Sequence, residues 1–252
     1  MTIFDVIVLL FAGFLAGVMN AIAGGGTLIT FPAMISTGLS PLTANASSAL
    51  AVWPGHAVAA PAAWRSVRGG SRGLIVRVCV ALVGGTVGAS LLLLTGERLF
   101  AVLVPWLLLT ATLLFAFGPQ LQKLSSSRSN SSALSPMVLT LEFAASIYGG
   151  YFGAGLGILL MAMLIILEQQ DLRAANALKN LLASIVTSIA VVIFIVTGAV
   201  SWQHATPALV GALIGGVFGA RIAERVPTKA LRAAIIGIGF VLTTHFMIQG
   251  YW

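Results

Sequence analysis

Long apolar runs follow one another along this chain, separated by short polar or glycine-rich breaks. The runs cover 3–23, 24–37, 44–63, 73–95 and 98–118, and then 136–153, 154–168, 174–197, 204–223 and 230–249. Several of them, such as 100–117, are apolar on every face, whereas the strands of a closed membrane barrel alternate between apolar and polar residues. The pattern therefore predicts about ten helical segments in a membrane.

The amino-acid composition supports a membrane location. Of 252 residues, 59% are hydrophobic and 8% are charged, whereas soluble proteins average about 25% charged residues. Too few charges are present to cover a water-exposed surface, which excludes a soluble globular enzyme, a disordered protein and a disulfide scaffold. The single cysteine, Cys79, excludes a thiol–disulfide carrier, which needs two. We expect an all-α polytopic membrane protein.

The chain divides into two halves that repeat each other. A serine-rich stretch at 119–135, expected to be a cytoplasmic linker, separates a first transmembrane repeat at 1–118 from a second at 136–252. Residues 131 positions apart match: Gly24, Gly26, Ala44, Asn45, Ala46, Gly84, Gly85 and Gly88 recur as Gly155, Gly157, Ala175, Asn176, Ala177, Gly215, Gly216 and Gly219. An ungapped match over this length indicates an internal duplication, which is frequent in secondary transporters.

Loop charges predict how the two repeats are related. The loop at 64–72 contains three arginines, and its counterpart at 196–203 contains no charged residue. The next loop shows the opposite distribution of charge: 95–98 contains one basic residue, and its counterpart at 221–232 contains four. Basic loops face the cytoplasm, so equivalent loops face opposite sides. We expect two inverted-topology repeats of five segments, with both termini outside the cytoplasm. The net charge of +7 has the same explanation, and no nucleic-acid partner is expected.

Glycine-rich breaks separate the first apolar segment of each half from the second. They are formed by Gly24, Gly25, Gly26 and Thr27 in the first half and by Gly155 and Gly157 in the second. As a helix, 24–37 would be about 21 Å long, too short for a bilayer core of about 30 Å. Helices broken near the membrane midplane present N-terminal N–H groups that attract anions. The alternative is close helix packing through small residues, which we favour for Gly84–Gly88 and Gly215–Gly219 because no break follows them.

Polar residues mark the start of the third segment in each half. They are Asn45, Ser47 and Ser48 in the first half and Asn176, Lys179 and Asn180 in the second. Amide and hydroxyl donors with one lysine suit an oxyanion, because the lysine compensates its charge. The alternatives are helix capping by the asparagines and serines, and a Lys179 side chain that reaches to the membrane surface.

Three further ionisable residues fall inside apolar segments. His56 is a candidate substrate ligand or proton carrier, or else a packing residue, and Glu142 is a candidate proton-coupling carboxylate or the buried partner of a basic side chain. Arg77 is expected to reach the membrane surface. Catalytic motifs, phosphate-binding loops and metal-ligand clusters are missing from the sequence, so we expect no catalytic residue, metal or cofactor.

These motifs together resemble those of the TauE/SafE family of sulfite and sulfonate exporters. The resemblance covers nearly the whole chain and is carried by Gly24-Gly25-Gly26-Thr27, Phe31-Pro32, Gly38-Leu39-Ser40-Pro41, Ala44-Asn45-Ala46-Ser47-Ser48, Gly153-Ala154-Gly155-Leu156-Gly157 and Ala175-Asn176-Ala177-Leu178-Lys179-Asn180. It implies transport of small sulfur-containing anions or organic acids across the inner membrane.

We therefore expect a secondary transporter of the cell inner membrane. It would export sulfite, sulfoacetate or another organosulfonate, with proton coupling left open. The expected partners are this small anion and the lipid bilayer, and a homo-oligomer is compatible with the sequence. A passive anion channel and an intramembrane enzyme or cofactor-handling protein are the alternatives.

Overall fold

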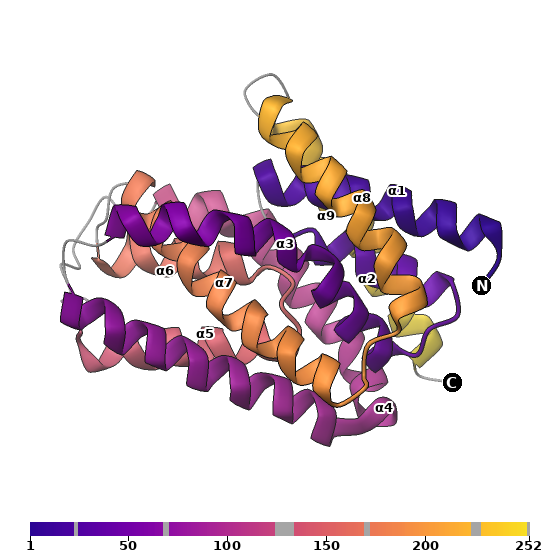
Figure 1. Ribbon diagram of the computed structural model, residues 1–252, viewed down its shortest axis with the longest axis horizontal. Helices are drawn as coiled ribbons and strands as arrows, with labels where there is room; N and C mark the ends of the chain where they lie inside the picture. Colours follow the sequence, from indigo (N-terminus) through magenta and orange to yellow (C-terminus); the bar gives the residue numbers. More distant parts are fainter. Residues whose placement is uncertain (23–24, 68–70, 124–133, 169–171, 223–227, 251–252) are drawn as a thin grey trace.

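The protein is built from helices. The computed structural model describes residues 1–22, 25–67, 71–123, 134–168, 172–222 and 228–250, and these ranges contain no strand (Figure 1). The helices are α1 (Ile3–Ile22), α2 (Thr27–Ser36), α3 (Pro41–Val67), α4 (Ser71–Lys123), α5 (Pro136–Tyr151), α6 (Leu156–Glu168), α7 (Leu172–Val196), α8 (Trp202–Ile222) and α9 (Thr228–Gly250).

Helix α4 consists of two arms that meet at Gly96. The backbone there has φ 71° and ψ 168°, outside the helical region, in a conformation that glycine adopts most easily. Gly88 of the first arm and Phe100 of the second both contact Tyr151 at the end of α5, so the chain folds back at Gly96. With α4 counted as two arms, the described residues contain the ten predicted helical segments.

The prediction of an all-α membrane protein is confirmed. Within the described residues, three stretches are long and apolar enough to cross a bilayer, at 3–21, 73–114 and 174–196, and shorter apolar helices cover 27–36, 156–167 and 236–248. Large apolar side chains are exposed along α1, α4 and α8, among them Phe4, Leu94 and Val217. A lipid environment accounts for such a surface, which a soluble monomer would not leave bare.

The short helices α2 and α6 occur where the glycine breaks predict them. They contain 10 and 13 residues, about 15 Å and 20 Å of helix. Positive φ angles at Gly25, Gly153 and Gly155 turn the chain before each of them. Helix α5 begins with a local signal, because the Ser135 hydroxyl accepts a hydrogen bond from the Val138 N–H at 3.3 Å and Pro136 follows directly.

The two halves interlock. Helix α1 packs on α8, the first arm of α4 packs on α5, and α3 packs on α7 (Figure 1). Under the offset of 131 residues, α1 corresponds to α5 and the first arm of α4 corresponds to α8. Each half therefore packs its first helix on the fourth segment of the other half.

Small residues allow these helices to approach closely. A Cβ atom on Gly215 would lie 2.0 Å from the Phe14 carbonyl oxygen, and one on Gly88 would lie 2.1 Å from the Ile147 carbonyl oxygen. The predicted packing role of Gly84–Gly88 and Gly215–Gly219 is confirmed, since Gly84 and Gly219 also face backbone within 3.0 Å.

Candidate functional site

A central cavity lies between the two glycine breaks. Its volume is about 150 Å³, and helices α3 and α7 complete its wall. The lining residues are Asn20, Ala21, Gly25, Thr27, Gly55, His56, Gly153, Gly155, Leu156, Gly157, Lys179, Asn180, Ala183 and Thr187. Seven predicted site residues thus meet in one cavity: Gly25, Thr27, His56, Gly155, Gly157, Lys179 and Asn180.

Lys179 supplies the positive charge at this cavity. Its Cδ atom lies 3.8 Å from the Cβ position of Gly157, so the side chain passes over the start of α6. Its ammonium group donates a hydrogen bond to Asn176 Oδ1 at 2.8 Å. An ammonium group has three N–H donors, and the other two have no acceptor in the described part of the chain. Asn176 itself is exposed and lies outside the cavity lining.

The two helix starts differ in their hydrogen bonding. The Gly26 N–H at the start of α2 donates to Asn20 Oδ1 at 2.9 Å. The corresponding N–H on α6, that of Gly157, has no acceptor among the described residues. The amide nitrogen Nδ2 of Asn20 has no acceptor among the residues that the structure describes, and it lies 3.6 Å from the Cβ position of Gly55 on the cavity wall.

A smaller hollow of about 20 Å³ adjoins the central cavity and shares His56 and Thr27 with it. Asn45 lines this hollow and is 1% exposed. Its Nδ2 donates to the Tyr151 carbonyl oxygen at 3.0 Å, whereas its Oδ1 has no partner in the described ranges. The hollow has room for about one water molecule.

The two predicted serines lie outside the central cavity. Ser48 forms a hydrogen bond with Thr30 of α2, and the Ser47 hydroxyl accepts from the Ser201 N–H at 2.9 Å. Both serines are fully buried, so they hold α3 against α2 and the start of α8. Gly26, also predicted, is in contact with Ala16. Gly24 lies outside the described residues.

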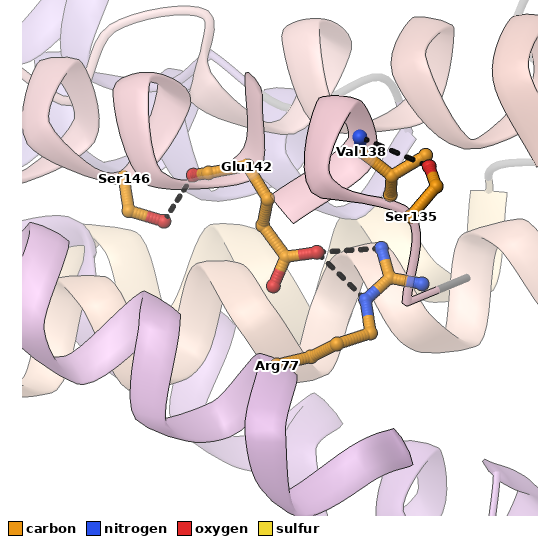
Figure 2. Close-up of polar contacts among 5 residues, drawn as sticks. All are labelled: Arg77, Ser135, Val138, Glu142 and Ser146. Atoms are coloured by element: carbon orange, nitrogen blue, oxygen red, sulfur yellow. Dashed lines mark hydrogen bonds and ion pairs between the residues drawn. The ribbon is translucent and has the colours of Figure 1, made fainter. Parts of the chain in front are cut away.

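Glu142 is held in an ion pair away from the central cavity. Both Nε and Nη2 of Arg77 lie 2.6 Å from Glu142 Oε2, between α4 and α5 (Figure 2). The side chains are 3% and 0% exposed. The expectation that Arg77 reaches the membrane surface is wrong, because a buried carboxylate needs a charged partner and Arg77 provides it. The alternative role predicted for Glu142, partner of a basic side chain, is confirmed.

Comparison with known proteins decides the family. The model of the family described as "Sulfite exporter TauE/SafE" matches residues 9–246. This chain belongs to the TauE/SafE family. The description of this family names an exporter, and the structure is that of a helical membrane protein.

Similar curated proteins carry transporter names. A "Probable membrane transporter protein" of Haemophilus influenzae is 30% identical over 156 residues, 61% of this chain and 60% of that protein. "Probable membrane transporter protein ORF9" of a Sinorhizobium species is 29% identical over 148 residues, 58% of this chain and 55% of that protein. "Probable membrane transporter protein YfcA" of Escherichia coli K12 is 29% identical over 150 residues, 60% of this chain and 55% of that protein. The aligned part thus covers less than two thirds of each relative, and no solved structure matches.

Seven of the fourteen residues that line the cavity in this TauE/SafE chain were not predicted from the sequence, among them the polar residues Asn20 and Thr187. Asn20 is the single amide at the end of an apolar run, six residues before Gly26. An isolated amide in an apolar run beside a glycine break is a candidate partner for the unpaired N–H groups of the next helix start, and this signal was available in the sequence. Its orientation toward the cavity follows only from the hydrogen bond that occupies its oxygen.

Proposed function

We propose that this TauE/SafE transporter moves a small sulfur-containing oxyanion, such as sulfite, sulfoacetate or another organosulfonate, across the inner membrane, and that the central cavity is its substrate site. The observation that carries the proposal is the position of Lys179, which lines a cavity built from the glycine breaks of both halves. A lysine within a membrane protein is costly unless it has a function or a partner.

The electrostatics of the cavity favour an anion. An unpaired anion inside a membrane protein is costly, and the ammonium of Lys179 offsets its charge. The start of α6 adds about half a positive charge, together with the free N–H of Gly157. Asn180 and the Asn20 amide group also line the cavity and supply neutral donors. Oxygen atoms of a sulfite or sulfonate group accept such hydrogen bonds.

The proposal includes inverted repeats, with both termini outside the cytoplasm. It is supported by the opposite charges of equivalent loops and by the exchange of first helices between the halves. In such transporters the two halves rock about a shared site, which opens alternately to each side. We also propose export as the direction and His56, which lines both hollows, as the proton carrier.

Transport by the purified protein in proteoliposomes tests this function. We expect saturable transport of sulfite or a sulfonate, with sulfoacetate, taurine and acetate as comparison substrates, and faster transport when a pH gradient is imposed. Liposomes without protein give the background. Failure to bind or transport any of these anions would overturn the proposal, and a conductance that does not saturate would assign the protein to the passive channels instead.

A further inference from the structure

Two side-chain oxygens that can only accept hydrogen bonds border the smaller hollow. Asn45 Oδ1 is buried there without a partner in the described part of the chain, while the amide nitrogen of Asn45 donates to the Tyr151 carbonyl oxygen at 3.0 Å. Thr187, which also lines the hollow, donates its hydroxyl proton to the Ala183 carbonyl oxygen at 2.6 Å. The Thr187 oxygen therefore has only lone pairs left for a ligand.

The end of α5 adds backbone oxygens to the same hollow. Gly149 and Gly150 lie in the last turn of this helix and line the hollow. Among the described residues, neither of their carbonyl oxygens accepts a backbone hydrogen bond, because the chain turns at Gly153, whose N–H bonds to the Tyr148 carbonyl oxygen instead. Free carbonyl groups at a helix end together carry about half a negative charge. The lining of the smaller hollow is thus rich in acceptors and negative partial charge.

The internal repeat indicates what an asparagine at this position binds. Under the offset of 131 residues, Asn45 and Ser48 correspond to Asn176 and Lys179. Asn176 Oδ1 accepts a hydrogen bond from the Lys179 ammonium at 2.8 Å, so the second half supplies its own cation. In the first half a serine stands at the lysine position and is bonded to Thr30. Asn45 Oδ1 therefore has no cation from the chain itself.

We propose that the smaller hollow binds a small monovalent cation such as Na⁺, which takes in the first half the place that the Lys179 ammonium has in the second. Its ligands are Asn45 Oδ1, the Thr187 hydroxyl oxygen and the carbonyl oxygens at the end of α5. A water molecule has two protons to donate, whereas a cation contacts all of these acceptors at once. The hollow, at about 20 Å³, has room for one small ion. Its lining contains no Asp or Glu, the ligands that Ca²⁺ and Mg²⁺ prefer, which favours a monovalent ion.

This cation acts on anion binding, a part of the inference that rests on the proposed function, whereas the cation site itself does not. The smaller hollow adjoins the central cavity, and Lys179 lines only the latter. The cation and the Lys179 ammonium repel each other, and an anion in the central cavity is attracted to both. Cation and anion should therefore raise each other's affinity by the same factor.

Binding of radioactive sodium to the full-length protein in nanodiscs tests the site, with empty nanodiscs as the background. Mildly alkaline pH keeps His56, which also lines the hollow, uncharged. We expect saturable Na⁺ binding that choline, too large for the hollow, does not displace. Thr187→Val removes one ligand oxygen at nearly the same side-chain shape, and Asn45→Leu removes another. Each variant should weaken Na⁺ binding at least about 10-fold, the loss of one contact to a charged group.

Thr243→Val on α9 is the matched control for Thr187→Val. The Thr243 hydroxyl is also buried and also donates to the carbonyl oxygen four residues earlier, that of Gly239, at 2.7 Å, but it lies outside the hollow. This variant should bind Na⁺ like the wild type. Lack of saturable Na⁺ binding in the wild type would overturn the inference and assign the hollow to water. Na⁺ binding that Thr187→Val and Asn45→Leu both retain would place the cation elsewhere and overturn it as well.

Sulfite affinities measured in sodium and in choline salts of the same anion test the coupling. We expect the affinity to be at least about fivefold higher in sodium, and this ratio to fall close to one in Thr187→Val. Equal sulfite affinities of the wild type in the two salts would overturn the coupling. Na⁺ binding at this site without binding of sulfite or any sulfonate would instead overturn the proposed function and leave the cation site standing.

Discussion

Arg77 and Glu142 are 65 residues apart in the chain, yet Nη2 of the first lies 2.6 Å from Oε2 of the second. The pair joins α4 of the first half to α5 of the second. The positions 131 residues away from them are Ala208 and Phe11, both apolar. The two equivalent helix pairs are therefore held together differently. Small residues and an ion pair join α4 to α5, whereas small residues without this ion pair join α1 to α8.

Removal of one member of this ion pair should destabilise the protein strongly. We expect Arg77→Met to cost about 3–5 kcal/mol, because it leaves the Glu142 carboxylate buried without its arginine. The double variant Arg77→Met/Glu142→Leu should recover most of the loss, since no charge remains. Thermal unfolding in detergent measures both, with Arg98→Met at an exposed site of α4 as the control. Single variants as stable as the control would show that the pair adds nothing.

Lys179→Met should weaken anion binding by roughly 10- to 150-fold, the loss of a charge-assisted contact of about 1.5–3 kcal/mol. Lys179→Arg keeps the charge and should bind much more tightly than Lys179→Met. Sulfite or methanesulfonate binding in nanodiscs gives both affinities. If well-folded Lys179→Met bound like the wild type, the charge would have to come from the helix ends or His56.

Two substitutions of Asn20 should separate its effect on anion binding from its effect on protein stability. Asn20→Asp keeps an acceptor for the Gly26 N–H but replaces the amide donor with a negatively charged oxygen. We expect at least about 10-fold weaker anion binding, from the lost hydrogen bond and added repulsion, at unchanged thermal stability. Asn20→Ala removes the acceptor as well and should lower stability by about 1 kcal/mol. Wild-type anion affinity in Asn20→Asp would restrict Asn20 to its capping role.

Much of the fold follows from local sequence signals. Apolar runs of the right length predict the helices, and the predicted break at 95–98 and the predicted start at 136 coincide with the bend at Gly96 and with the first residue of α5. The glycine breaks predict the short helices α2 and α6 because glycine readily interrupts a helix. These features depend on backbone preferences within a few residues, so a single sequence is enough to predict them.

The hydrogen-bond partners could not be predicted. Ser47 and Ser48 resemble substrate ligands in the sequence, but Ser47 accepts from Ser201, 154 residues away, and Ser48 bonds to Thr30. Arg77 likewise has the sequence context of a residue that reaches the membrane surface. Such partners depend on how distant helices pack, which neither hydrophobic periodicity nor spacing records.

Membrane orientation of equivalent loops tests the inverted repeats. In a Cys79→Ser background, needed because Cys79 is exposed, we introduce single cysteines at Arg68, Arg225 and Gln203. Gln203 is chosen within the loop at 196–203 because its side chain is exposed, whereas Val200 of the same loop is 7% exposed. An impermeant thiol reagent should label Gln203→Cys in intact cells and the other two only after permeabilisation. Labelling of Arg68→Cys and Gln203→Cys from the same side would exclude inverted repeats.

The exchange of first helices between the halves has a consequence for biosynthesis. Helix α1 is synthesised long before α8, the helix that covers its glycine face, which spans Trp202–Ile222. During translation, α1 must remain in the bilayer with this face bare, or held by an insertion factor, until α8 has left the ribosome. Neither half can complete its packing as a separate polypeptide, so a chain that ends before α8, like one that lacks the first arm of α4, should be recognised as unassembled and degraded.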